Sequence, residues 1–189
     1  MDPDGPSTIA VAVGASAWRT HLADPEEICR QAARAALAQV PAPSWLARAE
    51  VSVLLADDAA VRRLNAAWRG RDRATNVLSF PTFERIPEAA PRHLPQGPVP
   101  LGDVVLALET VRDEAEAAGK SLADHASHLV VHGCLHLLGY DHQNGAGAAR
   151  MESLERLALE RLGIADPYAG DAESSTSAGK DEPALETIR

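Results

Sequence analysis

The sequence contains little cysteine and no apolar segment of membrane-spanning length. Only two cysteines occur among its 189 residues, Cys29 and Cys134, and they lie far apart in the chain. A disulfide framework is therefore not expected, and reduced thiols in a cytoplasmic protein are the simplest interpretation. A transmembrane helix needs roughly 18 or more apolar residues in a row, and no run reaches that length. The first ten residues, MDPDGPSTIA, lack the basic segment of a secretory signal.

Positive charge is also scarce overall, although it is concentrated in one segment. The formal net charge is −9, which argues against generic nucleic-acid binding because phosphate contacts need local positive charge. The segment VRRLNAAWRGRDR (61–73) has a single acid, Asp72, and five arginines: Arg62, Arg63, Arg69, Arg71 and Arg73. Two interpretations stay open, a solvated face or a basic edge that contacts phosphates.

The pattern of apolar residues predicts one domain of mixed secondary structure. Hydrophobic residues make up 46% of the chain, enough for a substantial core. Alternating, β-branched segments predict strands at 8–13, 49–56, 76–80 and 103–108. Helical periodicity with capping residues predicts helices at 24–40, 57–69, 109–119, 121–138 and 149–163. Four strands and about five helices in mixed order indicate an α+β or α/β domain.

Three segments do not fit this pattern of elements. Residues 81–100 contain six prolines, which predicts a long irregular loop. Residues 1–7 are expected to be a loose lead. Residues 170–189 contain few core-forming side chains and are expected to be a disordered tail. The folded domain is therefore predicted to span residues 8–169.

The segment HGCLHLLGYDH (132–142) has the ligand spacing of a metal site. His132 and His136 are one helical turn apart and lie on one face of the predicted helix. Gly139 can adopt the left-handed conformation that turns the chain back, so that His142 reaches the other two. Three neutral imidazoles with an open fourth position are typical of a catalytic zinc-type site. The alternative is a helix end followed by a loop histidine, with no metal.

The residue after the first histidine is Gly133, which distinguishes this motif from a zinc protease. In an H-E-x-x-H protease the glutamate takes a proton from the metal-bound water, and glycine cannot do so. Three neutral ligands also leave the metal its full positive charge, which suits an anionic substrate. His128 and His132 have the same spacing, but no turn delivers a third ligand to them. His128 is therefore expected to lie behind the ligands or to face the substrate, and Cys134 is expected to pack in the core.

The histidine motif resembles the signature of the YbeY endoribonucleases, also called rRNA maturation factors. The segments LNAAWRGRDRATNVLSFP (64–81) and LGDVVL (101–106) are similar to two further parts of that family's pattern. The resemblance covers about residues 50–168. It implies a mixed four-stranded sheet surrounded by helices. It also implies a metal-dependent, single-strand-specific endoribonuclease that acts in maturation of the 16S rRNA 3′ end and in ribosome quality control.

The same resemblance implies roles for three residues. Arg69 corresponds to the family's functional arginine, His132 to a ligand that is also needed for activity, and Asp103 to the acid of the Leu-Gly-Asp strand. An arginine fork suits the nonbridging oxygens of a phosphate, and a carboxylate can orient an imidazole or accept a proton from water. The alternatives are an arginine that caps helix carbonyls and an aspartate that stabilises a turn.

The cofactor and partners follow from these assignments. We expect one divalent ion, with zinc favoured over nickel, copper and iron, bound by His132, His136 and His142. The expected partners are single-stranded rRNA, contacted by Arg62, Arg63, Arg71 and Arg73, and the small ribosomal subunit or its assembly factors. Two other functions stay open, a metallo-hydrolase that uses the proline-rich loop as a lid on a small substrate, and a non-catalytic ribosome-assembly factor with a structural metal.

Overall fold

The computed structural model describes most of the chain. Residues 8–41, 43–83, 86, 98–142 and 145–169 are described, together with the backbone of Glu186–Thr187. The predicted lead at 1–7, most of the proline-rich loop and nearly all of the predicted tail lie outside these residues. The expectations for those three segments therefore stay predictions.

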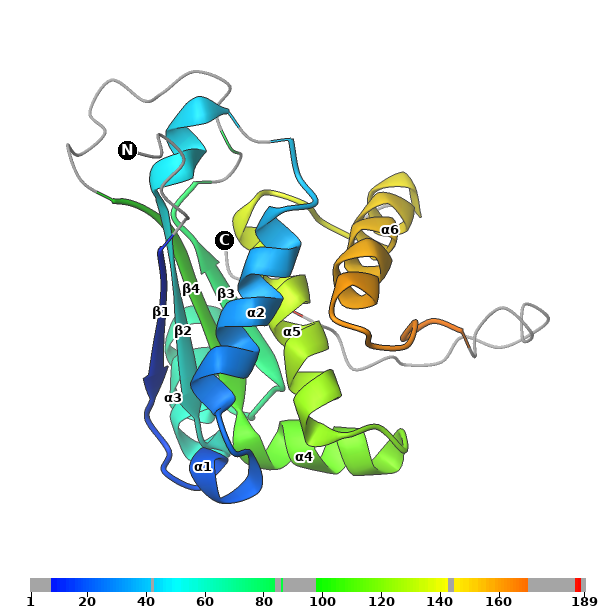
Figure 1. Cartoon of the computed structure of the whole chain (residues 1–189). Coiled ribbons are helices and arrows are strands. Elements are labelled where there is room, and N and C mark those ends of the chain that lie inside the picture. The colour runs from blue at the N-terminus through cyan, green and yellow to red at the C-terminus, as the bar shows by residue number, and fades with distance from the viewer. Residues whose placement is uncertain are drawn as a thin grey trace.

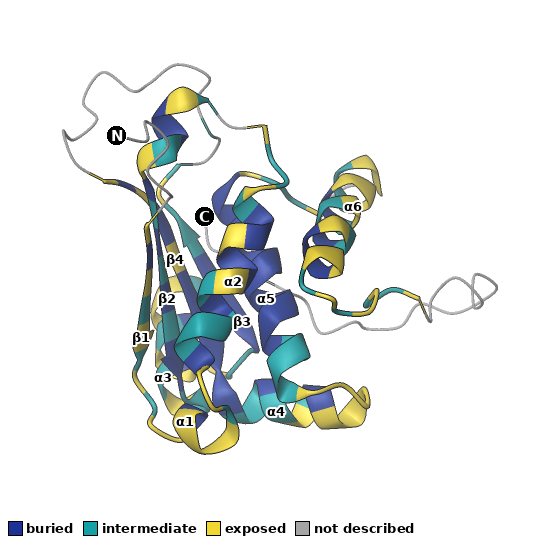
Figure 2. Cartoon of the chain, in the orientation of Figure 1, coloured by how far each residue is buried: buried dark blue, intermediate teal, exposed yellow. Residues whose placement is uncertain are grey.

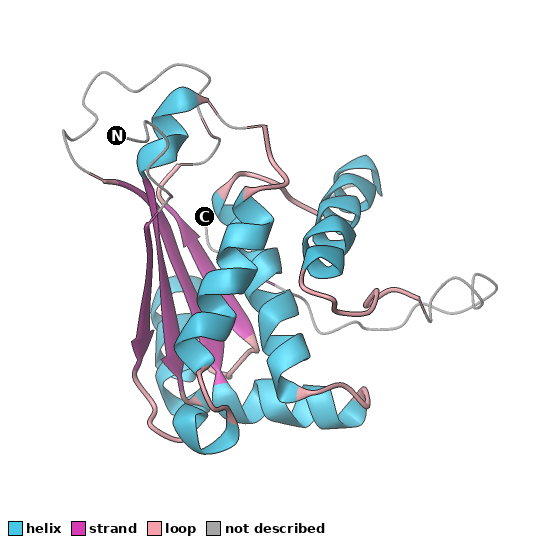
Figure 3. Ribbon diagram, in the orientation of Figure 1, coloured by secondary structure: helices cyan, strands magenta, loops and turns pink. Residues whose placement is uncertain are grey.

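All four predicted strands are present and form one mixed sheet (Figure 3). Its parallel strands are β1 (Thr8–Val13), β2 (Ala49–Ala56) and β4 (Val99–Ala107), and β3 (Val77–Pro81) runs antiparallel to β4. The order is β1-β2-β4-β3, and a two-residue strand, β5 (Glu186–Thr187), extends the sheet at the outer edge of β3. The predicted α+β fold with a mixed four-stranded sheet is confirmed, with β5 as a short addition from the predicted tail.

Within the described residues, six α-helices surround the sheet. They are α1 (Trp18–His21), α2 (Pro25–Leu37), α3 (Asp58–Arg69), α4 (Leu108–Ala117), α5 (Leu122–Leu137) and α6 (Gly145–Arg161). The five longer helices match the five predicted ones. The one-turn α1 and the 3₁₀ turn at Ser44–Arg48 were not predicted, because segments of four or five residues are too short to show a hydrophobic period.

Side-chain caps explain where three of these helices begin. The carboxylate of Asp24 accepts from the Glu27 amide at 3.0 Å, and that of Asp57 accepts from the Ala60 amide at 2.7 Å. The Ser121 hydroxyl accepts from the amide three residues on at 3.0 Å. Each cap satisfies a backbone N–H that has no partner within the helix, so a short polar side chain marks the first turn.

The largest differences from the predicted boundaries are the starts of two elements. Strand β4 begins at Val99 rather than at residue 103, so that it includes Pro100 and pairs with the full length of β2. Helix α6 begins at Gly145 rather than at residue 149. In both cases the extra residues include proline, glycine or alanine, and tertiary pairing and packing override their local propensity.

The helices lie in two layers, one on each side of the sheet. In Figure 1, α2 and α5 cover one face of the sheet, α6 lies outside them, and α3 covers the other face. The larger core lies under α2 and α5, and a smaller cluster that includes Val61, Leu78 and Val105 lies under α3. Figure 2 shows that α5 is buried along most of its length. None of the helices within the described ranges is long and apolar enough to cross a membrane.

Both cysteines belong to the larger core. Cys29 and Cys134 are 1% and 0% exposed, and neither is in a disulfide. Burial raises the pKa of each thiol to about 12, so both are neutral at physiological pH. The expected packing role of Cys134 is confirmed, since this residue of α5 is fully buried among the apolar side chains of the larger core.

Candidate metal centre

Helix α5 positions two of the three predicted ligands. His132 and His136 are each 3% exposed, on the last two turns of this buried helix. Their ring centroids lie 4.5 Å apart, as the i, i+4 spacing predicts. Because α5 is packed against the sheet by apolar side chains on its other faces, both imidazoles are held in a fixed place.

A tight turn at Gly139 supplies the third ligand. Gly139 has a φ of 83°, and the Tyr140 amide donates to the Leu135 carbonyl at 3.1 Å, a pattern that ends a helix and reverses the chain. His142 consequently returns to the helix end, with ring centroids 5.6 Å from His132 and 5.2 Å from His136. One nitrogen from each of the three rings lies within 4.8 Å of the others. The predicted cluster is therefore brought together.

Hydrogen bonds select one tautomer for each buried ring. The Nδ1 of His136 lies 2.9 Å from the carbonyl oxygen of Tyr140, which can only accept, so this nitrogen carries the proton. The Nδ1 of His132 lies 2.7 Å from the carboxylate of Glu155 and donates in the same way. The two Nε2 atoms then face each other at 2.9 Å with their lone pairs. Two opposed lone pairs repel unless a cation lies beside them, so the residues present fit a metal ion.

Burial keeps these two rings in the neutral form that a metal requires. Burial lowers the pKa of His136 to about 3, with a further contribution from the neighbouring histidines. Burial also lowers the pKa of His132, against the opposing effect of Glu155. Two ligands are therefore deprotonated at Nε2 across the physiological pH range, while His142 is exposed and leaves one side of the cluster open.

A buried glutamate holds the His132 ring, and the sequence did not single it out as a functional residue. Glu155 on α6 is 1% exposed and accepts hydrogen bonds from His132, from His128 at 3.0 Å and from the Tyr168 hydroxyl. Burial raises the pKa of this carboxyl, but the hydrogen bonds from His128 and His132 outweigh it, so the pKa lies well below its ordinary value. An ionised carboxylate behind a ligand imidazole fixes the ring and raises its basicity.

A signal for Glu155 was present in the sequence. It is an acid at a buried position on the apolar stripe of α6, between Met151 and Leu159, where a charge needs a specific partner. Its partner on α5 is 23 residues away, which no local pattern reveals. His128 binds the carboxylate of Glu155 and lies behind the ligands. This is the first of the two places predicted for it, the other being a position that faces the substrate.

Close packing against the sheet accounts for the glycine in place of the protease glutamate. A Cβ atom at Gly133 would lie 2.7 Å from the Cγ1 atom of Val104 and 3.0 Å from the Ser79 hydroxyl. This position therefore faces β3 and β4, where any side chain would push α5 away from the sheet. Gly133 has a packing role, and a general base is not available at that place.

The family model of endoribonuclease YbeY matches residues 17–163, which include the three histidines and Glu155. The chain belongs to the YbeY family. A relative from Paramagnetospirillum magneticum, endoribonuclease YbeY, is 51% identical over 85% of this chain and 94% of its own. The corresponding protein of Azorhizobium caulinodans is 49% identical over 87% of this chain and 98% of its own. One from Rhodopseudomonas palustris is 46% identical over 87% and 91%. The family predicted from the sequence is confirmed.

Within this YbeY fold, Asp103 does not lie with the histidines. Strand side chains alternate between the two faces, and its neighbour Val104 packs under α5 against Gly133. Asp103 is therefore on the opposite face, directly across from Phe80 of β3, and it is exposed. This placement argues against contact between Asp103 and a ligand imidazole, while its role as an acceptor of a proton from water stays a prediction.

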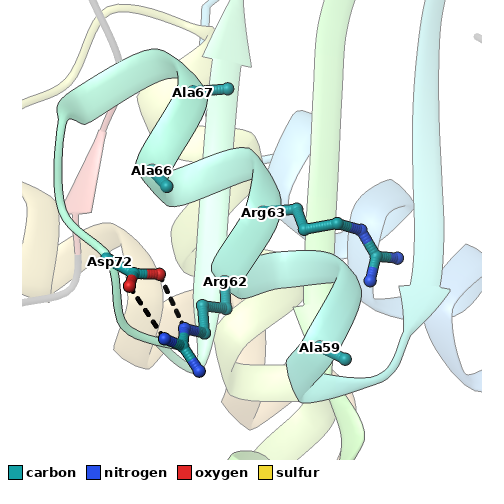
Figure 4. Close-up of a pocket in the computed structure, with 6 residues that line it drawn as sticks. All are labelled: Ala59, Arg62, Arg63, Ala66, Ala67 and Asp72. Carbon is teal, nitrogen blue, oxygen red and sulfur yellow. Dashed lines mark hydrogen bonds and ion pairs between the residues drawn. The ribbon is translucent and has the colours of Figure 1, made fainter.

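Two of the predicted arginines lie on α3 itself, one ends it, and two follow in the next turn: Arg62 and Arg63, Arg69, and Arg71 and Arg73. Arg69 is half-buried at the end of α3, where burial and the charge of Arg71 lower its guanidinium pKa. Arg62 is exposed and binds Asp72 through two hydrogen bonds of 2.7 and 2.8 Å. Figure 4 shows this pair and shows Arg63 pointing away from it, beside a shallow hollow that the small side chains of Ala59 and Ala66 leave open.

Proposed function

We propose that this YbeY-family chain is a metal-dependent endoribonuclease that cleaves single-stranded RNA during rRNA maturation. One observation carries the metal dependence: the Nε2 lone pairs of His132 and His136 converge at 2.9 Å beside the exposed ring of His142. The name of the relatives, endoribonuclease YbeY, supplies the class of reaction. The small ribosomal subunit, or a factor bound to it, is the partner that this function implies.

The three histidines would hold a divalent ion, and zinc suits imidazole nitrogen in this geometry. When bound, the ion supplies positive charge to a phosphoryl oxygen or to a water molecule. The neutral rings of His132 and His136 do not offset that charge. Glu155 keeps His132 in one orientation, and the exposed His142 marks the side from which a phosphodiester can approach.

Arg69 is the second positive group in this proposal. Phosphoryl transfer needs charge neutralisation on more than one oxygen, and a guanidinium offers two parallel donors for that purpose. Partial burial removes Arg69 from bulk water, which strengthens its interaction with an anion. Arg62, Arg63, Arg71 and Arg73 contribute to RNA binding in this proposal, and no role at the metal is assigned to Asp103.

A cleavage assay with parallel metal analysis tests the proposed function. Wild-type protein should carry about one divalent ion per chain and cleave a labelled single-stranded RNA, while the same sequence annealed into a duplex stays intact. His136→Ala should lose both the ion and the cleavage. His21→Ala, an exposed histidine on α1, is the matched control and should retain both. Wild-type cleavage by His136→Ala would remove the metal cluster from the reaction.

A further inference from the structure

Trp68 on the last turn of α3 is exposed to an unusual degree. It is 66% exposed, whereas the other two tryptophans, Trp18 and Trp45, are 0% and 7% exposed. Burying an indole ring is strongly favourable, so a ring left in water contributes little to stability. Aromatic and arginine side chains together are the groups on which nucleic-acid bases stack.

The indole is held in place by a second aromatic ring. Trp68 and Phe80 of β3 meet at 76° with their centroids 6.0 Å apart, so the edge of one ring meets the face of the other. In either version of this contact, at least one face of the indole is not covered by Phe80. A fixed aromatic face costs little entropy when a planar ligand stacks on it.

The charges on α3 and in the turn that follows favour a base over this ring and phosphates along the arginines. Arg63 lies five residues before Trp68 on the same helix, Arg71 lies three residues after it, and both are exposed. Asp103 lies across from Phe80 on the same face of the sheet, so its carboxylate disfavours a phosphate there. An RNA strand with its backbone along the arginines therefore presents its uncharged bases to Trp68.

Trp68 and the histidine cluster approach the same end of the sheet from its two faces. Trp68 contacts Phe80, the next-to-last residue of β3. Leu137, next to His136 on α5, contacts the paired part of β4, since its side chain lies 2.9 Å from where a Cβ of Gly102 would be. An RNA strand that reaches both places must bend around this end of the sheet. Single-stranded RNA is flexible enough to bend in this way at a low cost in free energy.

We propose that Trp68 is a stacking platform for one base of the single-stranded RNA, on the far side of the sheet edge from the metal cluster. The proposal rests on the proposed RNA-cleaving function. In this proposal Arg63 and Arg71 contact the phosphate backbone of the same nucleotides. The site discriminates single strands from duplexes, because a paired base is already stacked and cannot also cover the indole.

Intrinsic fluorescence tests the contact directly, because Trp68 is the one exposed tryptophan of the three. An oligouridylate is mixed with the full-length, metal-loaded protein, and emission is read in the first seconds, before cleavage accumulates. The tryptophan fluorescence of the wild type should be quenched when the RNA binds. Trp68→Phe should lose the quench and bind only severalfold more weakly. Trp68→Leu, which keeps an apolar contact to Phe80, should bind roughly 5- to 100-fold more weakly.

Kinetics and salt dependence distinguish base stacking from a phosphate contact or a general apolar contact. Trp68→Leu should raise KM and leave kcat within about twofold, and the salt dependence of binding should not change, because no phosphate contact is lost. Leu157→Ala, which removes the other large exposed apolar side chain in the described part of the chain, should behave as the wild type. Cleavage and binding by Trp68→Leu equal to wild type would overturn the proposal. A wild type that neither binds nor cuts RNA would overturn the proposed function as well.

Discussion

The two faces of the sheet carry opposite kinds of chemistry. On the α5 side, where α6 packs against α5, two neutral histidines and a buried carboxylate are enclosed and hydrogen-bonded, with one exposed ring at the opening. On the α3 side, the polar groups are exposed arginines around a shallow hollow, beside an exposed indole. A metal site needs fixed, desolvated ligands, whereas phosphate contacts along a flexible chain need charge that solvent can reach. The difference separates a reactive centre from a binding surface.

Reversing the charge of Arg69 should have the largest effect on cleavage. Arg69→Glu places a like charge against phosphate, so cleavage should fall by at least about 100-fold. Arg69→Lys keeps the charge but loses the bidentate contact, so the cleavage rate should fall by about tenfold. Cleavage rate and bound metal are measured together, with Arg112→Glu on α4 as the exposed control. Loss of metal in Arg69→Glu would mean that the substitution disturbs the metal cluster itself and not only the contact with phosphate.

Removing Glu155 should weaken the metal site by up to two orders of magnitude. Glu155→Ala releases the His132 ring, and metal affinity measured by chelator competition should fall roughly 10- to 100-fold. The donors of His128 and Tyr168 also lose their acceptor, so the free energy of unfolding should fall by about 1–3 kcal/mol. Glu152→Ala, on the same helix but half-exposed and paired only with Arg156 in the described contacts, should change neither quantity much. Equal metal affinity in the two variants would contradict the assigned role.

Filling the contact between α5 and the sheet should cost stability. Gly133→Ala places a methyl group against Val104 and Ser79, so the helix must move, and the free energy of unfolding in urea should fall by about 1–3 kcal/mol. Gly145→Ala is the control, because a Cβ there meets nothing within 4 Å. A Gly133→Ala protein as stable as Gly145→Ala would show that α5 can move away from the sheet at little cost.

Two neighbouring arginines on α3 should differ in their contribution to RNA binding. Arg63→Ala should lower the slope of log affinity against log salt by about one unit, because one phosphate contact is lost. Arg62→Ala should lower it less, because Asp72 already neutralises that guanidinium. Filter binding at several salt concentrations measures both slopes. A larger change for Arg62 than for Arg63 would mean that the ion pair opens on binding.

Asp103→Asn should have the smallest effect on the metal. Asp103 lies on the face away from the histidines, so elemental analysis should give the same metal content as in the wild type. A clear loss of metal would place this carboxylate within reach of the cluster and would overturn its assignment to the α3 face.

The parts of the fold that depend on neighbours in sequence were predictable. The caps at Asp24, Asp57 and Ser121 and the boundaries of β2 match the expected ones within a residue or two. The predicted start of β4 was wrong, because its true start at Val99 depends on pairing with β2, some 50 residues earlier in the chain. Pairing of that kind overrides the low strand propensity of Pro100.

For the candidate site, the sequence by itself determined which three histidines come together. The helical spacing of His132 and His136 and the turn at Gly139 are local consequences of backbone geometry. Only the tertiary structure decided which groups surround those ligands. Strand register set the face on which Asp103 lies, and the docking of α6 brought Glu155 to His132. Such contacts join residues far apart in the chain, and their geometry exists only once the sheet and helices are packed.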